Sequence, residues 1–329
     1  MKLRWLLLSV LLVVTLVPAG LVTVARLLDL TGGTWVRLVS FTPYAGVLYA
    51  LALLPLLLVA IRGRGFARGT ARCLGVVAGV GLLMHAYWAS GPFLGTSAAQ
   101  ASGGDRLHVM TSNLLLGNAD ATQVVNVARD HDVDLLVLEE VTPQALTELR
   151  SAGIRHAFPH RAGRAEPGTH GTMVFSAYPL QKVRRLDTAF GSYGMDVRLP
   201  GGRVHLLAVH PRPPIGDVMQ WRTDHRAIRQ AARGRPGRTM IVGDLNATMD
   251  HAPLRELVGR GYDDAATRAT SGWQPTWPAA GEVSRFGIPV PSLLTIDHVF
   301  LSAGLRAVST ESVTIEGTDH RALVATVAL

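Results

Sequence analysis

The first hundred residues are dominated by long runs without charge. Arg4 and Arg26 bracket 21 uncharged residues, and Arg37 and Arg62 bracket another 24. A helix needs about 20 mostly apolar residues to cross the hydrocarbon core of a bilayer. A third, shorter apolar run extends over residues 73–90. The pattern predicts three transmembrane helices, with a cleaved signal peptide as the alternative interpretation of the first run.

The pattern changes after residue 105. Segments with strand character occur at residues 106–113, 134–140, 172–180, 203–210, 238–244, 296–302 and 322–329. Between them, helical spacing occurs at residues 121–130, 143–150, 217–233 and 253–260. Many short strands with a few interspersed helices predict an α+β domain, in which sheets pack face to face and helices lie outside.

A segment of different composition separates the two patterns. Residues 91–104, GPFLGTSAAQASGG, are mostly small or polar and carry no charge, which is typical of a flexible tether. We therefore expect a membrane anchor over residues 1–92, a linker over residues 93–104 and one folded domain over residues 105–329.

Composition and charge agree with a membrane anchor. The chain is 48% hydrophobic and 17% charged, whereas soluble domains have about 25% charged residues. Of the net charge of +8, the part before Asp105 holds eight basic residues and one acidic residue, Asp29, so residues 105–329 carry only +1. The basic surplus is therefore a topology signal more than a nucleic-acid footprint. The single cysteine, Cys73, excludes an internal disulfide and a cysteine-rich metal site.

The basic residues also predict an orientation. The link between the second and third apolar runs holds four arginines, and two basic residues precede the first run: Arg62, Arg64, Arg68, Arg72, Lys2 and Arg4. Segments rich in lysine and arginine face the cytoplasm. Three crossings from a cytoplasmic N-terminus place the folded domain on the outer side. The apolar runs contain no acidic residue, which argues against a transporter.

Polar residues gather at the ends of the predicted strands. In residues 241–246, an apolar strand ends in glycine, and Asp244 and Asn246 then point the same way because side chains alternate along an extended chain. The structural alternative is a turn in which Asp and Asn bond their own backbone. His210 closes another strand, and Asp297 opens one.

The remaining strand ends have the same character. Asn113 ends the first strand, and Asp319 and His320 precede the last one. Glu139 and Glu140 follow a buried strand, where we expect one acid to be solvated and only the other to have a role. Carboxylates, amides and imidazoles collected in this way suit a hard divalent cation and a phosphate group.

Taken in order, these motifs resemble those of the endonuclease/exonuclease/phosphatase superfamily, whose members share a DNase I-like fold. The matching motifs are Thr111-Ser112-Asn113, Leu138-Glu139-Glu140, residues 171–179, His210-Pro211, residues 243–246, Ile296-Asp297-His298 and Thr318-Asp319-His320. The resemblance covers residues 106–329 and implies a four-layer αββα sandwich. With its three predicted crossings, the chain is similar to the membrane-anchored type associated with teicoplanin resistance, the VanJ-like proteins.

The resemblance implies a metal site. Glu140 would be the principal ligand, because the family places its acid before a hydrophobic residue, here Val141. Asn113 and Asp319 would help to hold the ion, which would be Mg²⁺ or Mn²⁺.

The resemblance also implies catalytic roles. Asp244 would position or deprotonate the attacking water, and Asn246 would orient the phosphate or the nucleophile. His320, steadied by Asp297, would contact the scissile phosphate. His210 would stabilise charge or protonate the leaving oxygen.

Two positions depart from the family's pattern. Ala177 stands where the family often has an arginine, which puts a phosphate or structural contact in doubt, and Thr318 replaces a serine with retention of the hydroxyl. Residues 276–278, Thr-Trp-Pro, match a further family element that we interpret as packing or the rim of the cleft.

The expected function is that of an outward-facing, metal-dependent phosphoesterase acting on a lipid-linked phosphate or pyrophosphate, for which the resemblance indicates the undecaprenyl carrier. The alternative is a membrane-tethered extracellular nuclease, which would need an extended basic surface that a domain of charge +1 does not favour. A catalytically silent scaffold would lack a core motif residue, and none is missing.

Overall fold

The computed structural model describes residues 2–94, 105–233, 237–279, 281, 284–285 and 288–329. The chain forms two compact units: Met1–Gly91 with Asp250–Ala252, and Pro92–Met249 with Pro253–Leu329. Most of the expected linker over residues 93–104, namely residues 95–104, lies outside the described residues.

The first unit is helical. Its helices are α1 (Lys2–Leu27), α2 (Gly33–Val39), α3 (Thr42–Arg62) and α4 (Gly65–Ala89). Three of them, over Leu3–Leu27, Thr42–Arg62 and Gly65–Ala89, are long and apolar enough to cross a membrane, which agrees with the predicted number of spans. Helix α4 begins before the third apolar run, so Arg68 and Arg72 lie in its first turns.

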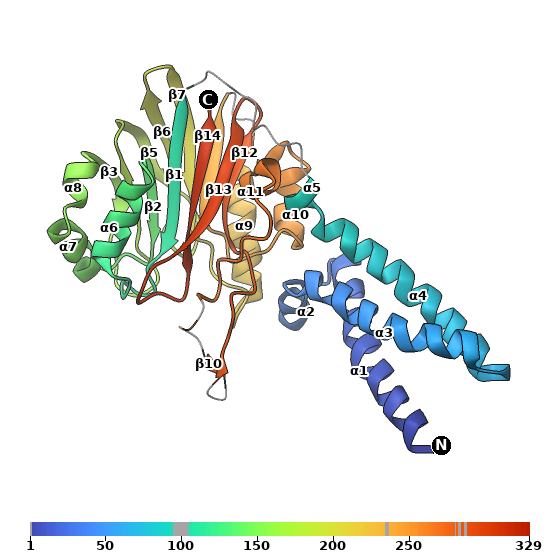
Figure 1. The fold of residues 1–329 in the computed structure, drawn as a ribbon. Helices are drawn as coiled ribbons and strands as arrows, with labels where there is room; N and C mark the ends of the chain where they lie inside the picture. Colours follow the sequence, from blue (N-terminus) through green and yellow to red (C-terminus); the bar gives the residue numbers. More distant parts are fainter. Residues whose placement is uncertain (1, 95–104, 234–236, 280, 282–283, 286–287) are drawn as a thin grey trace. The chain divides into compact units, whose positions relative to one another are not determined.

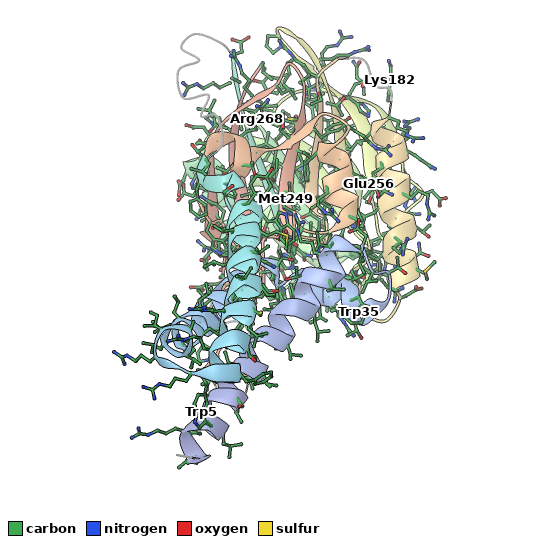
Figure 2. The ribbon with its side chains drawn as sticks, turned by 90° about the vertical axis from the view of Figure 1, so that its right-hand side faces the viewer. Trp5, Trp35, Lys182, Met249, Glu256 and Arg268 are labelled. Atoms are coloured by element: carbon green, nitrogen blue, oxygen red, sulfur yellow. The ribbon has the colours of Figure 1, made fainter. Side chains whose placement is uncertain are left out.

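Small residues and one polar cluster hold these helices together. A Cβ atom on Gly81 of α4 would lie 2.6 Å from the ring of Tyr49 of α3, so glycine permits this close packing. The hydroxyl of Thr23 lies 2.9 Å from both the Tyr49 hydroxyl and Nε2 of His85. Many large apolar side chains on the outer faces are exposed, and Trp5 near the start of α1 is one of them (Figure 2). Exposed apolar faces and an aromatic residue near a helix end are typical of a membrane span.

The second unit is built on two sheets of six strands each. The first has the order β13-β14-β1-β2-β4-β3. Strands β1 and β2 are parallel, and every other pair of neighbouring strands in this sheet is antiparallel. Its strands are β1 (Arg106–Asn113), β2 (Leu135–Glu139), β3 (His160–Arg164), β4 (Thr172–Ser176), β13 (Arg306–Thr314) and β14 (Arg321–Ala328).

The second sheet has the order β5-β6-β7-β8-β12-β9, with β7 parallel to β8. Its strands are β5 (Leu180–Arg185), β6 (Tyr193–Leu199), β7 (Gly202–Ala208), β8 (Thr239–Asp244), β9 (Tyr262–Asp264) and β12 (Asp297–Ser302). The short strands β10 (Ser284–Arg285) and β11 (Ile288–Pro289) form a separate pair.

The two sheets face each other, and helices cover their outer faces (Figure 1). Val109 and Val137 of the first sheet pack with Met195, Leu206 and Val242 of the second in one buried cluster. The helices that lie wholly or mostly in this unit are α5 (Gly91–Leu94), α6 (Ala121–Asp130), α7 (Pro143–Ser151), α8 (Ile154–Ala157), α9 (Val218–Ala232), α10 (Ala252–Val258) and α11 (Ala265–Ala269). The predicted α+β fold, a four-layer αββα sandwich preceded by three apolar helices, is confirmed.

Local sequence explains why the predicted helices form where they do. Asp120 caps α6 by accepting hydrogen bonds from the N–H groups of Thr122 and Gln123, and Val124, Val125 and Ala128 form its buried stripe. The sequence pattern does not predict strands β3, β5, β6, β9 and β13. Four of these are edge strands, as the strand orders above show, and five of the six residues of β5 are exposed, so it lacks an apolar alternation.

Candidate active site

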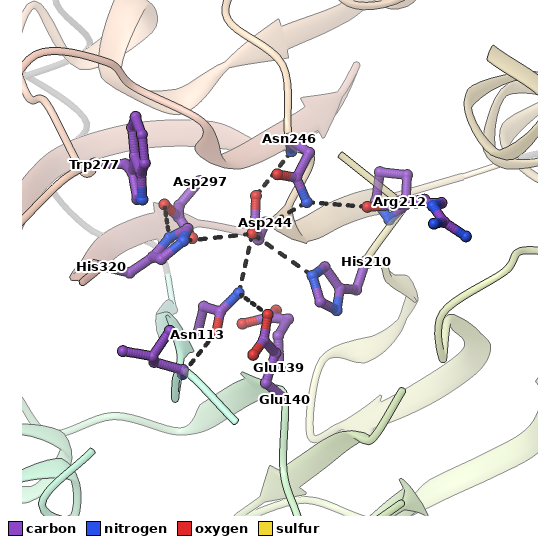
Figure 3. Close-up of polar contacts among 12 residues, drawn as sticks. Asn113, Glu139, Glu140, His210, Arg212, Asp244, Asn246, Trp277, Asp297 and His320 are labelled. Carbon is purple, nitrogen blue, oxygen red and sulfur yellow. Dashed lines mark hydrogen bonds and ion pairs between the residues drawn. The ribbon is translucent and has the colours of Figure 1, made fainter. Parts of the chain in front are cut away.

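Strand register brings the polar residues to one end of the sandwich. Asn113 and Glu139 are register partners where the parallel strands β1 and β2 end. In the other sheet, Asp244 at the end of β8 pairs with Asp297 at the start of β12. Since the two sheets are stacked, these four residues lie around one site, drawn in Figure 3.

Gly243 permits the close approach of three strands at this site. Its φ angle is +146°, and a Cβ atom there would lie 2.0 Å from the Val209 carbonyl oxygen and 3.1 Å from Oε1 of Glu139. No other residue type fits this position without moving the backbone that follows β7. The glycine before Asp244 is therefore required by packing between the ends of β2, β7 and β8.

Asp244 is the centre of the site (Figure 3). Its Oδ2 atom accepts a hydrogen bond of 3.1 Å from Nδ2 of Asn113 and lies 3.6 Å and 3.8 Å from Nε2 of His210 and His320. Its Oδ1 atom accepts a 2.8 Å hydrogen bond from the N–H of Asn246. The turn alternative is thus present as well: one carboxylate oxygen closes the turn, and the other faces the site.

Buried partners hold His320. Its Nδ1 atom lies 3.0 Å from Oδ2 of Asp297, which is fully buried. The Thr318 hydroxyl accepts from the N–H of His320 at 3.1 Å and donates to the Asn113 carbonyl at 2.8 Å. The hydroxyl that Thr318 retains therefore ties the loop before β14 to the end of β1.

The expected metal ligands lie beside this centre. Glu140 adopts φ +56°, and its carboxylate accepts from Nδ2 of Asn113 at 3.3 Å and from the N–H of Leu116 at 2.6 Å. Oδ2 of Asp319 accepts a 2.9 Å hydrogen bond from Nε1 of Trp277. The Thr-Trp-Pro element thus contributes a contact to a predicted ligand.

The expectation for Glu139 is wrong. Instead of one solvated acid, both Glu139 and Glu140 are buried, with exposed fractions of 0% and 9%. Glu139 points between the sheets, where the Thr111 hydroxyl donates to Oε1 at 2.9 Å and Oε2 has no hydrogen-bond partner among the described residues. Burial, together with the nearby Asp297 and Asp244, raises the pKa of Glu139 well above its usual value. The end of β2 is buried because β2 is an interior strand that faces a second sheet.

The two histidines have opposite electrostatic environments. Burial and, to a smaller extent, the positive charge on His320 lower the pKa of His210 to about 3, so His210 is neutral near pH 7. Burial also disfavours a charged His320, but the carboxylates of Asp297 and Asp244 outweigh burial and raise its pKa. Burial raises the pKa of Asp244 above the usual carboxyl value. The site therefore holds a cationic and a neutral imidazole on either side of one carboxylate.

The donor set fits a divalent cation. Carboxylate oxygens of Asp244 and Asp297 lie within 4.8 Å of each other and of a ring nitrogen of His320, which cannot itself bind the ion while the imidazole is cationic. Oδ1 of Asp297, like Oε2 of Glu139, is buried without a hydrogen-bond partner in the described part of the chain. Carboxylate oxygens are the ligands that hard cations prefer, and these oxygens lack enough hydrogen-bond donors to satisfy them. This group adjoins the predicted ligands Asn113, Glu140 and Asp319 through the Asn113–Asp244 hydrogen bond.

Several positioning residues escape the sequence analysis. Asp224 of α9 is fully buried and accepts from the N–H groups of Ala189 and Arg212, which fixes the loop after His210. The signal for it is an acid among the apolar positions of a helix, next to the buried Trp221 and Ile228.

Two further contacts complete the walls of the site. The Thr276 hydroxyl accepts from the N–H groups of Ile296 and Asp297 and so holds the start of β12. The ring of Phe190 packs between those of His170 and His210, with centroid distances of 5.2 Å and 5.0 Å. His170 itself is exposed.

Known structures share this fold. The chain is similar to an endonuclease/exonuclease/phosphatase from Beutenbergia cavernae (18% identity, 68% of this chain and 72% of that one, TM-score 0.52). It is also similar to D. rerio TDP2 complexed with a single-strand DNA product (15% identity, 68% and 100%, TM-score 0.57) and to Caenorhabditis elegans TDP2 (18% identity, 68% and 98%, TM-score 0.54). At these identities the likeness concerns the fold.

No curated protein matches the chain. The sequence of residues 110–320, however, matches the Endonuclease/Exonuclease/phosphatase family, and this range spans every residue of the site described above. The chain therefore belongs to the endonuclease/exonuclease/phosphatase family.

Proposed function

We propose that the protein is a membrane-anchored, metal-dependent phosphoesterase that hydrolyses a lipid-linked phosphate or pyrophosphate on the outer side of the membrane. Family members are hydrolases that act on phosphoester bonds, which supports the reaction class. One observation carries the proposal: buried carboxylates, an amide, one neutral histidine and one cationic histidine converge on Asp244. The same chain has three helices that are long and apolar enough to cross a membrane.

Metals are common in this family, and the residues present fit one. Glu140, Asn113 and Asp319 would hold Mg²⁺ or Mn²⁺, with the Asp244, Asp297 and His320 group beside them. When bound, the cation would neutralise phosphate oxygens and stabilise charge on the leaving oxygen.

The chain's own residues would do the remaining work. Asp244, with its raised pKa, can accept a proton from an attacking water near neutral pH, and the Asn246 N–H holds its carboxylate in place. His320, kept cationic by Asp297 and Asp244, would donate from Nε2 to a phosphoryl oxygen. Burial of all three side chains of this group, Asp244, Asp297 and His320, strengthens these interactions.

The neutral state of His210 limits its role. With a pKa of about 3, its imidazole is a poor source of a proton at neutral pH. Hydrogen bonding to the developing charge on the leaving oxygen therefore fits His210 better than protonation of that oxygen.

Three features support a lipid-linked substrate and the outward orientation. The three apolar helices would keep the catalytic domain near the bilayer, where a lipid-borne phosphate has a high effective concentration. The catalytic region has a net charge of only +1. Arg62 ends α3, and Arg68 and Arg72 begin α4, so the link between them is a basic segment suited to the cytoplasmic side. The similarity to the VanJ-like type makes undecaprenyl pyrophosphate the first substrate to test.

The experiment measures hydrolysis by the full chain in lipid nanodiscs with Mg²⁺, as phosphate release from monoesters and pyrophosphates and as bond cleavage in the phosphodiesters. The panel holds prenyl pyrophosphates, phospholipids, inositol phosphates and single-stranded DNA, the last because D. rerio TDP2 was crystallised with a DNA product. We expect release from prenyl pyrophosphate that is lost in Asp244→Ala and His320→Ala and kept in Glu148→Gln, whose side chain is exposed on α7. Activity that survives both changes contradicts the site, and cleavage of DNA alone replaces the lipid substrate with a nuclease function.

A further inference from the structure

A polar cavity away from the active site lies on the outer face of the second sheet. It has a volume of about 490 Å³ and is lined by Lys182 and Arg184 of β5, Asp196 of β6, Arg203 and His205 of β7, and Gly237 and Arg238 before β8. Four of these side chains are cationic and one is anionic. Such an excess of positive charge around a cavity favours an anionic ligand.

The cavity is built around a buried histidine, His205, and a partly buried carboxylate, Asp196. Asp196 and His205 are register partners on β6 and β7, and Nδ1 of His205 lies 3.0 Å from Oδ1 of Asp196. Nζ of Lys182 lies 3.4 Å and Nη1 of Arg203 3.8 Å from Oδ2 of the same carboxylate. Asp196 thus holds the imidazole and two cations in place.

Hydrogen-bonding capacity remains unused in this cavity. His205 is only 8% exposed, and its buried Nε2 atom has no hydrogen-bond partner among the described residues. A Cβ atom on Gly194 would lie 3.7 Å from both Nε2 of His205 and Nε of Arg184, so the glycine leaves open the space that these two nitrogens flank. In the part of the chain that the structure describes, Arg184 and Arg238 form no ion pair. A buried polar atom of this kind calls for a ligand or a partner.

Edge protection alone does not account for this arrangement. Basic side chains on an edge strand prevent pairing with other chains, which would explain Lys182 and Arg184 on β5. His205, however, lies on β7, an interior strand, and its backbone N–H is bonded to the Arg238 carbonyl at 2.8 Å. Preventing edge pairing needs no buried imidazole there.

The cavity is separate from the active site. His205 lies in the middle of β7 and Arg238 just before β8, whereas His210 follows the end of β7 and Asp244 ends β8. Five residues of extended chain span about 16 Å. A ligand here therefore would not touch the catalytic residues.

We propose that this cavity is a second anion site, which binds a phosphate group through Arg184, Arg238 and His205. Phosphate suits it because guanidinium groups pair with its oxygens, and because the His205 Nε2 atom can accept a hydrogen bond from a protonated phosphate oxygen or, as imidazolium, donate one. The phosphate has two sources, free phosphate and the headgroup of an anionic phospholipid.

Hydrogen exchange of the full chain in nanodiscs distinguishes these sources. One arm adds inorganic phosphate to phosphatidylcholine nanodiscs at constant ionic strength, with chloride as the reference salt, and the other replaces part of the lipid by phosphatidylglycerol. We expect slower exchange over residues 193–208 in at least one arm. Protection in the first arm identifies free phosphate, and protection only in the second identifies the headgroup.

Variants test the residues. Arg184→Ala with Arg238→Ala should weaken the response at least tenfold, as judged from the concentration of phosphate or the fraction of phosphatidylglycerol needed for half of the effect. The control, Arg155→Ala with Arg161→Ala, removes the same charge from exposed positions on α8 and β3 and should change nothing. Phosphate release at the active site should be unaffected by either pair. Absence of protection in both arms, or an equal response in the two pairs of variants, overturns the proposal.

Discussion

Glu139 and Glu140 are adjacent acids for which the structure predicts different consequences of the same substitution. Glu139 is fully buried, and its pKa is raised in the folded state. At pH values between the usual carboxyl pKa and this raised pKa, folding is therefore accompanied by uptake of a proton. In that range the folded state binds more protons than the unfolded state, so stability falls with increasing pH until the raised pKa is reached. The slope from this one group is at most about 1.4 kcal/mol per pH unit.

Glu139→Gln removes this slope without removing the oxygen that accepts from Thr111. The variant should therefore be more stable than the parent at pH 8 and should lose part of the parent's decline in stability as the pH rises above the usual carboxyl range. Denaturant unfolding of the full chain in detergent with EDTA measures both effects. Glu140→Gln should instead mainly reduce phosphate release, because Glu140 is the predicted metal ligand.

The control for Glu139→Gln is Glu148→Gln, which neutralises an exposed acid on α7 and should leave the slope unchanged. A Glu139→Gln protein that is less stable than the parent at pH 8, with an unchanged slope, would refute the reasoning. In that case Glu139 would be ionised and stabilised by a partner that the described contacts do not include.

Three further outcomes are expected. Thr318→Val should lower the free energy of unfolding by roughly 1–3 kcal/mol in a denaturant titration, because it leaves the Asn113 carbonyl and the His320 N–H without their buried partner; an unchanged stability would contradict this. Trp277→Phe removes the donor to Asp319 and should raise the Mg²⁺ concentration needed for half-maximal activity about tenfold, whereas an unchanged metal requirement would separate Asp319 from the metal. In a Cys73→Ser background, Arg155→Cys should react with a membrane-impermeant maleimide on intact cells if the catalytic domain faces outward, and protection until lysis would reverse the proposed orientation.

Much of the site is predictable from sequence because of how the sheets are built. Asn113, Asp244, Asp297 and His320 stand next to strongly apolar strands, and strand ends of known direction meet at a common edge. The order of the motifs then identifies the family and hence the fold. Helix α6 is predicted with its observed bounds from helical spacing alone, and the Asp120 cap and the apolar stripe explain why that prediction holds.

Other features depend on tertiary packing that no local pattern encodes. Strand β5, LQKVRR, is polar because it is an edge, and only its neighbour β6 makes it a strand. The burial of Glu139 depends on the second sheet lying across the end of β2. Asp224 on α9 accepts a hydrogen bond from the N–H of Arg212, which lies 12 residues earlier in the chain. This contact forms only when the chain is folded, so the sequence pattern does not predict a role for Asp224.

Metal binding to the full chain tests the central claim most directly. Manganese binding, followed by electron paramagnetic resonance in detergent, should be at least tenfold weaker in Glu140→Gln and in Asp244→Asn than in the parent, and unchanged in Glu148→Gln. Equal manganese affinity in all four proteins would contradict the conclusion that Glu140 and Asp244 belong to one metal-dependent phosphoesterase site.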